Sequence, residues 1–210
     1  LKNAGIIVVH VVSNEKFALK AETCGVDAVV AEGFEAGGHN GKEETTTLVL
    51  VPQIVNAVQI PVIAAGGIGT GKTMLAAMAL GAEAVQIGSR FVASLESSAH
   101  VNFKNAVIEA KDGATQLSLK QLTPVRLLKN EFWHQVASAE LKGAKKEDLI
   151  DLLGRARAKK GMFEGDLDAG ELEIGQISGY IDEIKPAAQI VEEIVAEFNT
   201  EIEKLSNIRL

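Results

Sequence analysis

Four short apolar runs recur in the first 90 residues, and helix-like segments separate them. The runs are GIIVVHVV at 5–12, DAVVAE at 27–32, PVIAA at 61–65 and AVQI at 84–87. They do not alternate between apolar and polar residues, so each predicts a strand buried on both faces, as in a parallel sheet. Strands that alternate with helices indicate an α/β fold built from βα units.

The segments between and after these runs have helical spacing. Ser13 is a candidate N-cap for a helix that carries Phe17, Ala18 and Ala21, and Thr47–Val58 and Met74–Leu80 predict two more helices. From about residue 97 the chain becomes more charged and helical in pattern. Residues 186–205 predict one amphipathic helix at the end of the sequence.

Charge and cysteine content exclude several classes of function. The net charge is −7, and no run of Lys and Arg is long enough for a nucleic-acid footprint, so no DNA or RNA partner is expected. The apolar runs are strand-sized, so no membrane segment is expected. Cys24 is the only cysteine, which fits a reducing cytoplasm, and its surroundings in the sequence are typical of a core residue. The first residue is Leu1 rather than Met, which indicates a missing N-terminal portion.

The loop GGIGTGKT at 66–73 matches the Walker A pattern between an apolar strand and a helix. On its face this pattern predicts a P-loop nucleotide triphosphatase. That class also needs a later strand that ends in Asp to hold Mg²⁺, whereas the AVQI strand ends in glycine and serine. We therefore keep the triphosphatase as an alternative from a different class and favour a more general phosphate loop.

Two glycine loops follow consecutive predicted strands. Gly66 and Gly67 follow the third strand, while Gly88 and Ser89 follow the fourth. Barrels of the (β/α)8 class bind phosphate with the loops after their last two strands, and glycine lets the backbone approach the anion. The alternative is that these glycines only make tight turns.

The loop EAGGHNG places His39 directly after the second strand, among glycines. Catalytic residues of α/β barrels lie at that end of the strands, and an imidazole can transfer a proton or donate a hydrogen bond near neutral pH. A lone histidine is as often structural. Glu32 and Glu35 flank the loop as candidate ligands for a hydroxyl group, and no metal-ligand set is expected.

Several of these motifs in order resemble a known family. The strings are VDAVVAEGFEAGGHNG, TTTLVLVPQIV, IPVIAAGGIGTG, LGAEAVQIGSRF and ELEIGQISG. Together they resemble the nitronate monooxygenase and 2-nitropropane dioxygenase family, which shares a superfamily with FMN-dependent enoyl-ACP reductases. The EAGGHNG and TTT portions are more similar to the reductases, whereas residues 8–29 are more similar to the nitronate enzymes.

The resemblance implies an FMN-binding (β/α)8 TIM-type barrel with His39 as the catalytic residue. It implies FMN phosphate contacts from Gly66, Gly67, Gly88 and Ser89, and flavin contacts from a further set of residues: Glu32, Ala36, Gly37 and Ala65. The implied reaction is oxidation of alkyl nitronates with O₂, and the alternative is reduction of an enoyl thioester with NAD(P)H as co-substrate. Lys72 maps to no role in the family.

A barrel has eight strands, and this sequence shows four, which the resemblance identifies as strands five to eight. We therefore expect residues 1–110 to form the C-terminal half of the barrel and residues 111–210 to form a mainly helical appendage packed on it. The absent N-terminal half would leave open strand edges. The expected partner is a small-molecule substrate, and a homodimer is left open.

Overall fold

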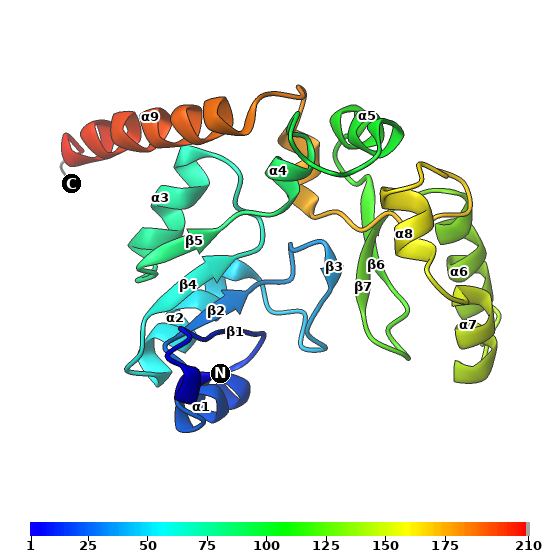
Figure 1. Ribbon diagram of the computed structural model, residues 1–210, viewed down its shortest axis with the longest axis horizontal. Coiled ribbons are helices and arrows are strands. Elements are labelled where there is room, and N and C mark those ends of the chain that lie inside the picture. The colour runs from blue at the N-terminus through cyan, green and yellow to red at the C-terminus, as the bar shows by residue number, and fades with distance from the viewer. Residues whose placement is uncertain (209–210) are drawn as a thin grey trace. The chain divides into compact units, whose positions relative to one another are not determined.

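The computed structural model describes residues 1–208, which form two compact units. Unit 1 comprises residues 1–35, 43–87 and 188–208, and unit 2 comprises residues 36–42 and 88–187. Neither unit has an edge at residue 110, where the sequence led us to expect a domain boundary. Each unit is described by itself below (Figure 1).

Unit 1 is built on a four-stranded parallel sheet, which confirms the four strands predicted from the apolar runs (Figure 1). Its order is β1–β2–β4–β5, with these bounds: β1 Val9–Val12, β2 Ala28–Glu32, β4 Val62–Ala65 and β5 Ala84–Gln86. Only the inner strands β2 and β4 are largely buried. The prediction that every strand is buried on both faces is wrong for β1 and β5, because both lie at the edges of the sheet and much of each is exposed.

Helices accompany this sheet, and one cluster of apolar side chains forms its core. The elements are η1 Lys2–Ala4, α1 Glu15–Thr23, α2 Thr47–Ala57, α3 Gly71–Ala79 and α9 Ala187–Ser206. The core includes Val29, Ala31, Leu50, Ile54 and Ala64, all almost fully buried. The cap of α1 is Asn14 rather than Ser13, since the Asn14 side chain accepts a hydrogen bond from the Phe17 amide. Cys24 is exposed rather than in the core, because it follows the end of α1.

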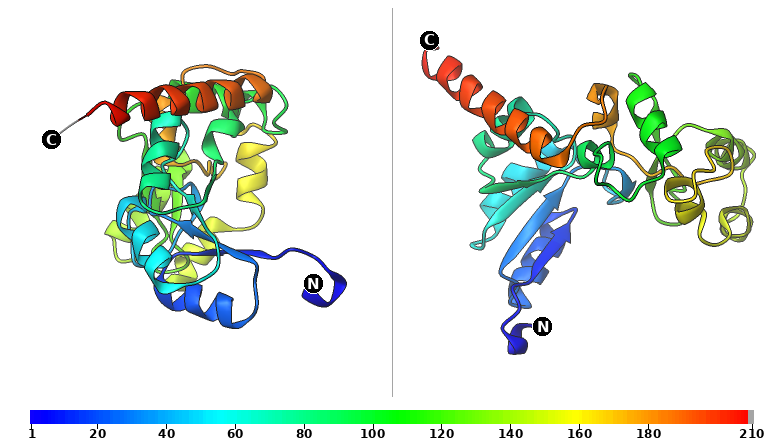
Figure 2. Two further views of the ribbon diagram at one scale, coloured as in Figure 1. Left: turned by 90° about the vertical axis from the view of Figure 1, so that its left-hand side faces the viewer. Right: turned by 45° about the horizontal axis from the view of Figure 1, so that its top comes forward.

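The long helix α9 lies beside α3 (Figures 1 and 2). Its buried residues include Ile190 and Ile194, four positions apart, which is the spacing of one helix face. The amphipathic helix predicted for the end of the sequence is therefore confirmed to within one residue at each end.

Unit 2 contains a second sheet that the sequence analysis did not predict. Strands β3 Gly38–His39, β6 Thr115–Ser118 and β7 Val125–Leu128 form an antiparallel sheet of order β3–β7–β6. The expectation that the chain is mainly helical after residue 97 missed the β6–β7 hairpin, whose strands are only four residues long. The other elements are α4 Ser89–Val92, α5 Val101–Glu109, α6 Glu131–Leu141, α7 Lys146–Leu153, α8 Arg157–Met162 and η2 Gln176–Tyr180.

An extended segment after α8 continues the β3 side of this sheet. The Leu128 amide donates to the Leu172 carbonyl oxygen at 2.8 Å, and Glu173 bridges to Leu127 in antiparallel fashion. Leu172 and Ile174 are both buried in the apolar core of unit 2. Side chains alternate between the two sides of an extended chain, so Glu171 and Glu173 lie on the opposite side from Leu172. Glu171 and Glu173 line the same pocket as His39.

Candidate active site

His39 is held by the short strand β3, which pairs with β7. Its partner in the register is Val125, and Gly38 lies opposite Arg126. The Asn40 amide donates to the carbonyl oxygens of Ala36 and Gly38, at 3.0 Å each, and so closes the loop around the histidine. The His39 side chain itself is exposed, as a group that meets a substrate must be.

The two glycines before His39 are required by close packing against residues 173–175. A Cβ on Gly37 would stand 2.6 Å from the Ile174 Cα, and a Cβ on Gly38 would stand 2.6 Å from Glu173 Oε2. Gly38 also has a positive φ of 75°, which side chains other than glycine rarely adopt. The glycine pair therefore lets the Glu173 carboxylate approach the backbone beside His39.

His39 and Glu173 line one pocket in unit 2, with a volume of about 270 Å³. Glu171 and Arg157 complete its charged lining, and its apolar wall includes Leu119, Leu122, Val125 and Leu153. Pockets that combine an apolar wall with a few convergent polar groups are the usual form of small-molecule sites. This pocket is the candidate active site.

Burial raises the pKa of both carboxyl groups in the pocket. It raises the pKa of Glu171 to about 7, an effect that the charge of Glu173 reinforces and that of Arg157 opposes. Burial also raises the pKa of Glu173, while His39 opposes that shift. A carboxyl group with a pKa of about 7, as at Glu171, can hold and release a proton near neutral pH, which is a property of catalytic sites.

Arg157 frames the pocket without forming a hydrogen-bonded ion pair with either carboxylate. Its guanidinium donates to the carbonyl oxygens of Leu152, Leu153 and Ala169, at distances of 2.7–3.2 Å. Its Cζ also lies 4.5 Å from the centre of the Phe132 ring. These contacts tie the end of α7 and the chain before Glu171 to α8, so Arg157 holds the walls of the site in place.

Four of the predicted cofactor residues lie in unit 1, at the carboxyl ends of β2 and β4. Glu32 and Ala65 are neighbours in the register of these strands, and burial raises the pKa of Glu32. Gly66 and Gly67 follow Ala65 with positive φ values of 92° and 68°, so both turn positions favour glycine.

Glu35 lies beside this loop and has a structural role. Its carboxylate accepts hydrogen bonds from the amide and the hydroxyl of Thr47, at 2.9 and 2.8 Å. It therefore occupies the start of α2, and the Thr47 hydroxyl also lies 2.9 Å from the Gly66 carbonyl oxygen. The candidate ligand role of Glu35 is not supported by these contacts.

The other predicted cofactor residues lie in unit 2. These are Ala36, Gly37, Gly88 and Ser89. The Ser89 hydroxyl oxygen accepts from the Gly175 amide at 2.9 Å, and Gly175 in turn packs against Gly37. A Cβ on Gly88 would meet nothing within 4 Å.

The chemistry of these loops fits the phosphate of an FMN. In unit 1, Gly66 and Gly67 turn the backbone with positive φ, and the Glu35 side chain lies 3.3 Å from the position that a Cβ on Gly67 would take. In unit 2, the space around Gly88 leaves its peptide open to a ligand, and the Ser89 hydroxyl keeps its proton for a further acceptor. Backbone amides and hydroxyls of this kind are ordinary phosphate ligands.

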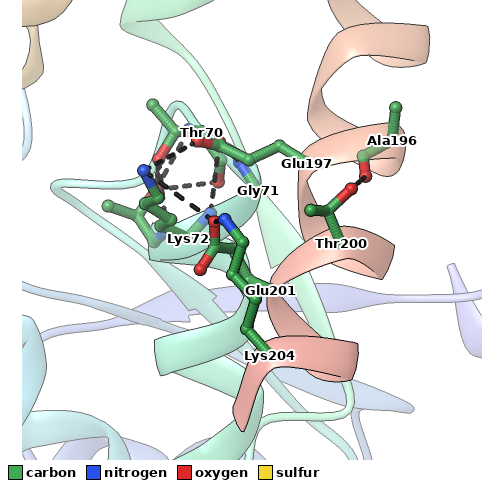
Figure 3. Close-up of polar contacts among 9 residues, drawn as sticks. Thr70, Gly71, Lys72, Ala196, Glu197, Thr200, Glu201 and Lys204 are labelled. Atoms are coloured by element: carbon green, nitrogen blue, oxygen red, sulfur yellow. Dashed lines mark hydrogen bonds and ion pairs between the residues drawn. The ribbon is translucent and has the colours of Figure 1, made fainter.

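The Walker-like loop is used for a different purpose in the structure. The Glu197 carboxylate of α9 accepts from the amides of Gly71 and Lys72, and the Lys72 ammonium lies 3.4 Å from the same carboxylate (Figure 3). A Cβ on Gly71 would stand 2.5 Å from the Ile194 carbonyl oxygen. A carboxylate therefore meets the amides and the lysine that a P-loop would offer to phosphates, which argues against the triphosphatase.

Among residues 1–208, no cluster of three or more His, Cys, Asp or Glu side chains is arranged to hold a metal ion. No helix in the same part of the chain combines the length and apolar character needed to cross a membrane.

The fold and this pocket define an α/β protein whose catalytic candidate is a histidine beside buried carboxyl groups. The model of the family described as nitronate monooxygenase matches residues 1–197, so the chain belongs to the nitronate monooxygenase family. The resemblance noted in the sequence is thereby confirmed.

Two relatives illustrate the range of this family. A probable nitronate monooxygenase of Staphylococcus saprophyticus is 39% identical over 147 residues, which span 65% of this chain and 41% of that protein. A Rhodococcus jostii protein is 31% identical over 246 residues, which span 100% of this chain and 69% of that protein. Its name is (3aS,4S,5R,7aS)-5-hydroxy-7a-methyl-1-oxo-octahydro-1H-indene-4-carboxyl-CoA dehydrogenase.

Solved structures give the same family. FabK from Thermotoga maritima superposes with a TM-score of 0.92 at 43% identity, over 98% of this chain and 65% of that chain. A nitroalkane oxidase from Streptomyces ansochromogenes superposes with a TM-score of 0.79 at 32% identity, over 98% of this chain and 61% of that chain. The chain thus has the α/β fold of these TIM-barrel proteins and spans just under two thirds of each.

Sequence reasoning missed Glu171, Glu173 and Arg157 as site residues. The signal for the two carboxylates was present in ELEI, where Glu alternates with Leu and Ile as in a strand with one buried face. Only the tertiary structure shows that the polar side of this segment lines the pocket of His39.

Proposed function

We propose that this chain is part of an FMN-dependent oxidoreductase that oxidises alkyl nitronates with O₂. The observation that carries the proposal is the placement of His39 in a pocket with one buried and one half-buried carboxyl group, in a chain that belongs to the nitronate monooxygenase family. When bound, FMN would supply the transfer of electrons between the substrate and O₂.

The role of His39 follows from its chemistry. A nitronate carries its negative charge on two oxygens, and an imidazole N–H beside them is a suitable hydrogen-bond donor. The apolar wall formed by Leu119, Leu122 and Val125 would pack against the alkyl group and exclude water from it.

The predicted FMN contacts complete the proposal. We infer that Gly66, Gly67, Gly88 and Ser89 bind the phosphate. Glu32, Ala36, Gly37 and Ala65 would contact the rest of the cofactor. The positive φ values of the first two glycines and the open space around Gly88 support this assignment.

Reduction of an enoyl thioester with NAD(P)H is a second candidate. It is favoured by the 43% identity to FabK, which exceeds the 32% identity to the nitroalkane oxidase. His39 would then face the enolate oxygen that develops during the reaction, so the same donor serves either chemistry.

One experiment separates these candidates. The full-length natural protein is purified, its flavin absorbance is recorded, and turnover is measured with a nitronate and O₂ and with an enoyl thioester and NAD(P)H. We expect yellow protein that consumes O₂ with the nitronate. Turnover of the thioester alone would replace the first candidate with the second, and colourless protein that hydrolyses ATP would overturn both.

A further inference from the structure

The proposed function uses His39 but leaves the two carboxyl groups of its pocket without a role. Glu171 is buried, with 8% of its surface exposed, and Glu173 is half-buried against Gly38. Within residues 1–208, no protein donor is hydrogen-bonded to either carboxylate, and neither group has an oxygen that is fully sealed from solvent. Partial burial without a protein donor still disfavours the ionised form of each group, so the pair needs a functional explanation.

The charged groups around the pair identify its partner. Arg157 faces the pocket from α8, but its guanidinium donates to carbonyl oxygens. Arg126 follows the pocket residue Val125 on β7, and side chains alternate along a strand, so its side chain lies on the face of the sheet away from the pocket. There it donates to Thr115 Oγ1 at 3.4 Å. His39 is the remaining titratable group that lines the pocket.

We propose that Glu173 positions and polarises the His39 imidazole, and that Glu171 holds an exchangeable proton behind it, so the three side chains act as one acid–base unit. This inference rests on the proposed role of His39. Glu173 is the positioning residue, because its carboxylate lies against the backbone of Gly38, directly beside the histidine. Glu171 lies two residues away on the same side of the segment and completes the unit.

The unit accounts for proton movement during turnover. Where His39 gives a proton to its substrate rather than only a hydrogen bond, the proton held on the carboxyl pair replaces it, and the pair regains one from water that reaches half-buried Glu173. The raised pKa of Glu171, about 7, keeps this proton available at neutral pH. No bond other than those to the transferred proton forms or breaks in this relay.

A titration that needs no substrate tests the coupling directly. The full-length natural protein is labelled with ¹³C at the Glu carboxyl carbons, and the two signals are assigned by their loss in Glu171→Gln and Glu173→Gln. We expect Glu171 to titrate near pH 7 and Glu173→Gln to lower that midpoint, with proton affinity falling roughly tenfold as a like charge is removed. His39→Gln should move the Glu173 midpoint upward, because an opposing positive charge is lost.

A matched control separates coupling from general charge effects. Exposed Glu109 ends α5 in the same unit, and Glu109→Gln should leave both midpoints unchanged. Trp133 donates to Ser118 within unit 2, so its fluorescence reports whether each variant is folded. If Glu173→Gln does not fold, Glu173→Asp replaces it. The shorter side chain should make the titration midpoint of the carboxyl group at position 173 less sensitive to His39→Gln. Titration midpoints of Glu171 and Glu173 that stay the same in every variant would overturn the proposal.

A kinetic arm distinguishes this inference from the proposed function. With the substrate that proves active, Glu171→Gln should remove the limb near pH 7 from the pH profile of kcat and leave KM within about twofold. Glu109→Gln should retain that limb. If the titrations of Glu171 and Glu173 are coupled but the protein turns over neither substrate, the proposed function is wrong and the acid–base unit is retained. An unchanged profile in Glu171→Gln would remove Glu171 from the relay.

Discussion

The carboxylate of Glu197 accepts a hydrogen bond from the backbone amide of Gly71, with 2.7 Å between Oε2 and N (Figure 3). This bond joins residues 126 positions apart in the sequence and fixes α9 to the first turn of α3. A negative side chain at a helix N-terminus is favourable because it satisfies free amides and complements the helix dipole. The loop has a nucleotide-binding pattern, but this contact uses it to attach α9 to α3.

Gly71→Ala should therefore destabilise unit 1. The new methyl group would overlap the α9 backbone at the Ile194 carbonyl oxygen and the Phe198 amide, and overpacking of this kind costs roughly 1–3 kcal/mol. Chemical denaturation measures the loss. Gly179→Ala is the control, because its Cβ would make only ordinary contacts at 3.7 Å or more. Equal stability of the two variants would show that α9 does not pack on α3 in this way.

Lys72→Ala should leave flavin binding and turnover nearly intact. Its side chain is largely exposed and its ion pair with Glu197 is a surface contact, worth less than about 1 kcal/mol. A P-loop lysine would instead contact phosphates directly, so its loss would abolish nucleotide binding. Flavin content and turnover of the purified variant decide the matter, and loss of the cofactor would restore the P-loop hypothesis.

Gly67→Asp and Ser89→Asp should each weaken FMN retention. A new carboxylate near the proposed phosphate site would repel a dianion at short range. Gly67→Asn and Ser89→Asn are the matched controls, since Asn has the same size without the charge and tolerates the positive φ of 68° at Gly67. Titration of FMN into the apoprotein gives the affinity of each variant. If the Asp and Asn variants bind alike, the phosphate lies elsewhere.

Glu171→Gln should change how stability depends on pH. The folded state raises the pKa of Glu171 from 4.5 to about 7, so it binds the proton more tightly than the unfolded chain does. Stability is therefore lost as pH rises from about 4.5 to about 7 and then levels off, a change on the order of 1–3 kcal/mol. Urea unfolding at several pH values should show this slope in the wild type and a flatter curve in Glu171→Gln. Parallel curves would contradict the assignment.

His39→Ala should keep bound FMN and lose most turnover. A lost donor to a developing negative charge costs roughly 2.7–4 kcal/mol, or about a 100-to-1000-fold lower rate. His39→Asn should lose less, because its amide can still donate. Flavin absorbance verifies that the cofactor is retained while the rate is measured with both substrates. Full activity of His39→Ala on both would reduce His39 to a residue of the loop.

Local sequence predicted the elements of unit 1 well and those of unit 2 only in part. Apolar runs such as DAVVAE signal buried strands without further information, because inner parallel strands meet apolar groups on both faces. Strands β6 and β7 carry no such signal: TQLS and VRLL are short, and the second includes the buried Arg126. Their pairing with β3 depends on residues far away in the chain.

The family, the parallel strands and the place of His39 in a glycine loop can all be predicted from the sequence, since these depend on motifs and on local periodicity. The groups that lie near His39 depend instead on how distant parts of the chain pack together. Glu171 and Glu173 lie more than 130 positions away along the chain, and the pairing of Glu173 with Leu127 on β7 brings their segment to the pocket. The contact of Gly71 with α9 depends on such packing too, because a carboxylate from the other end of the chain satisfies the amides that a phosphate pattern exposes.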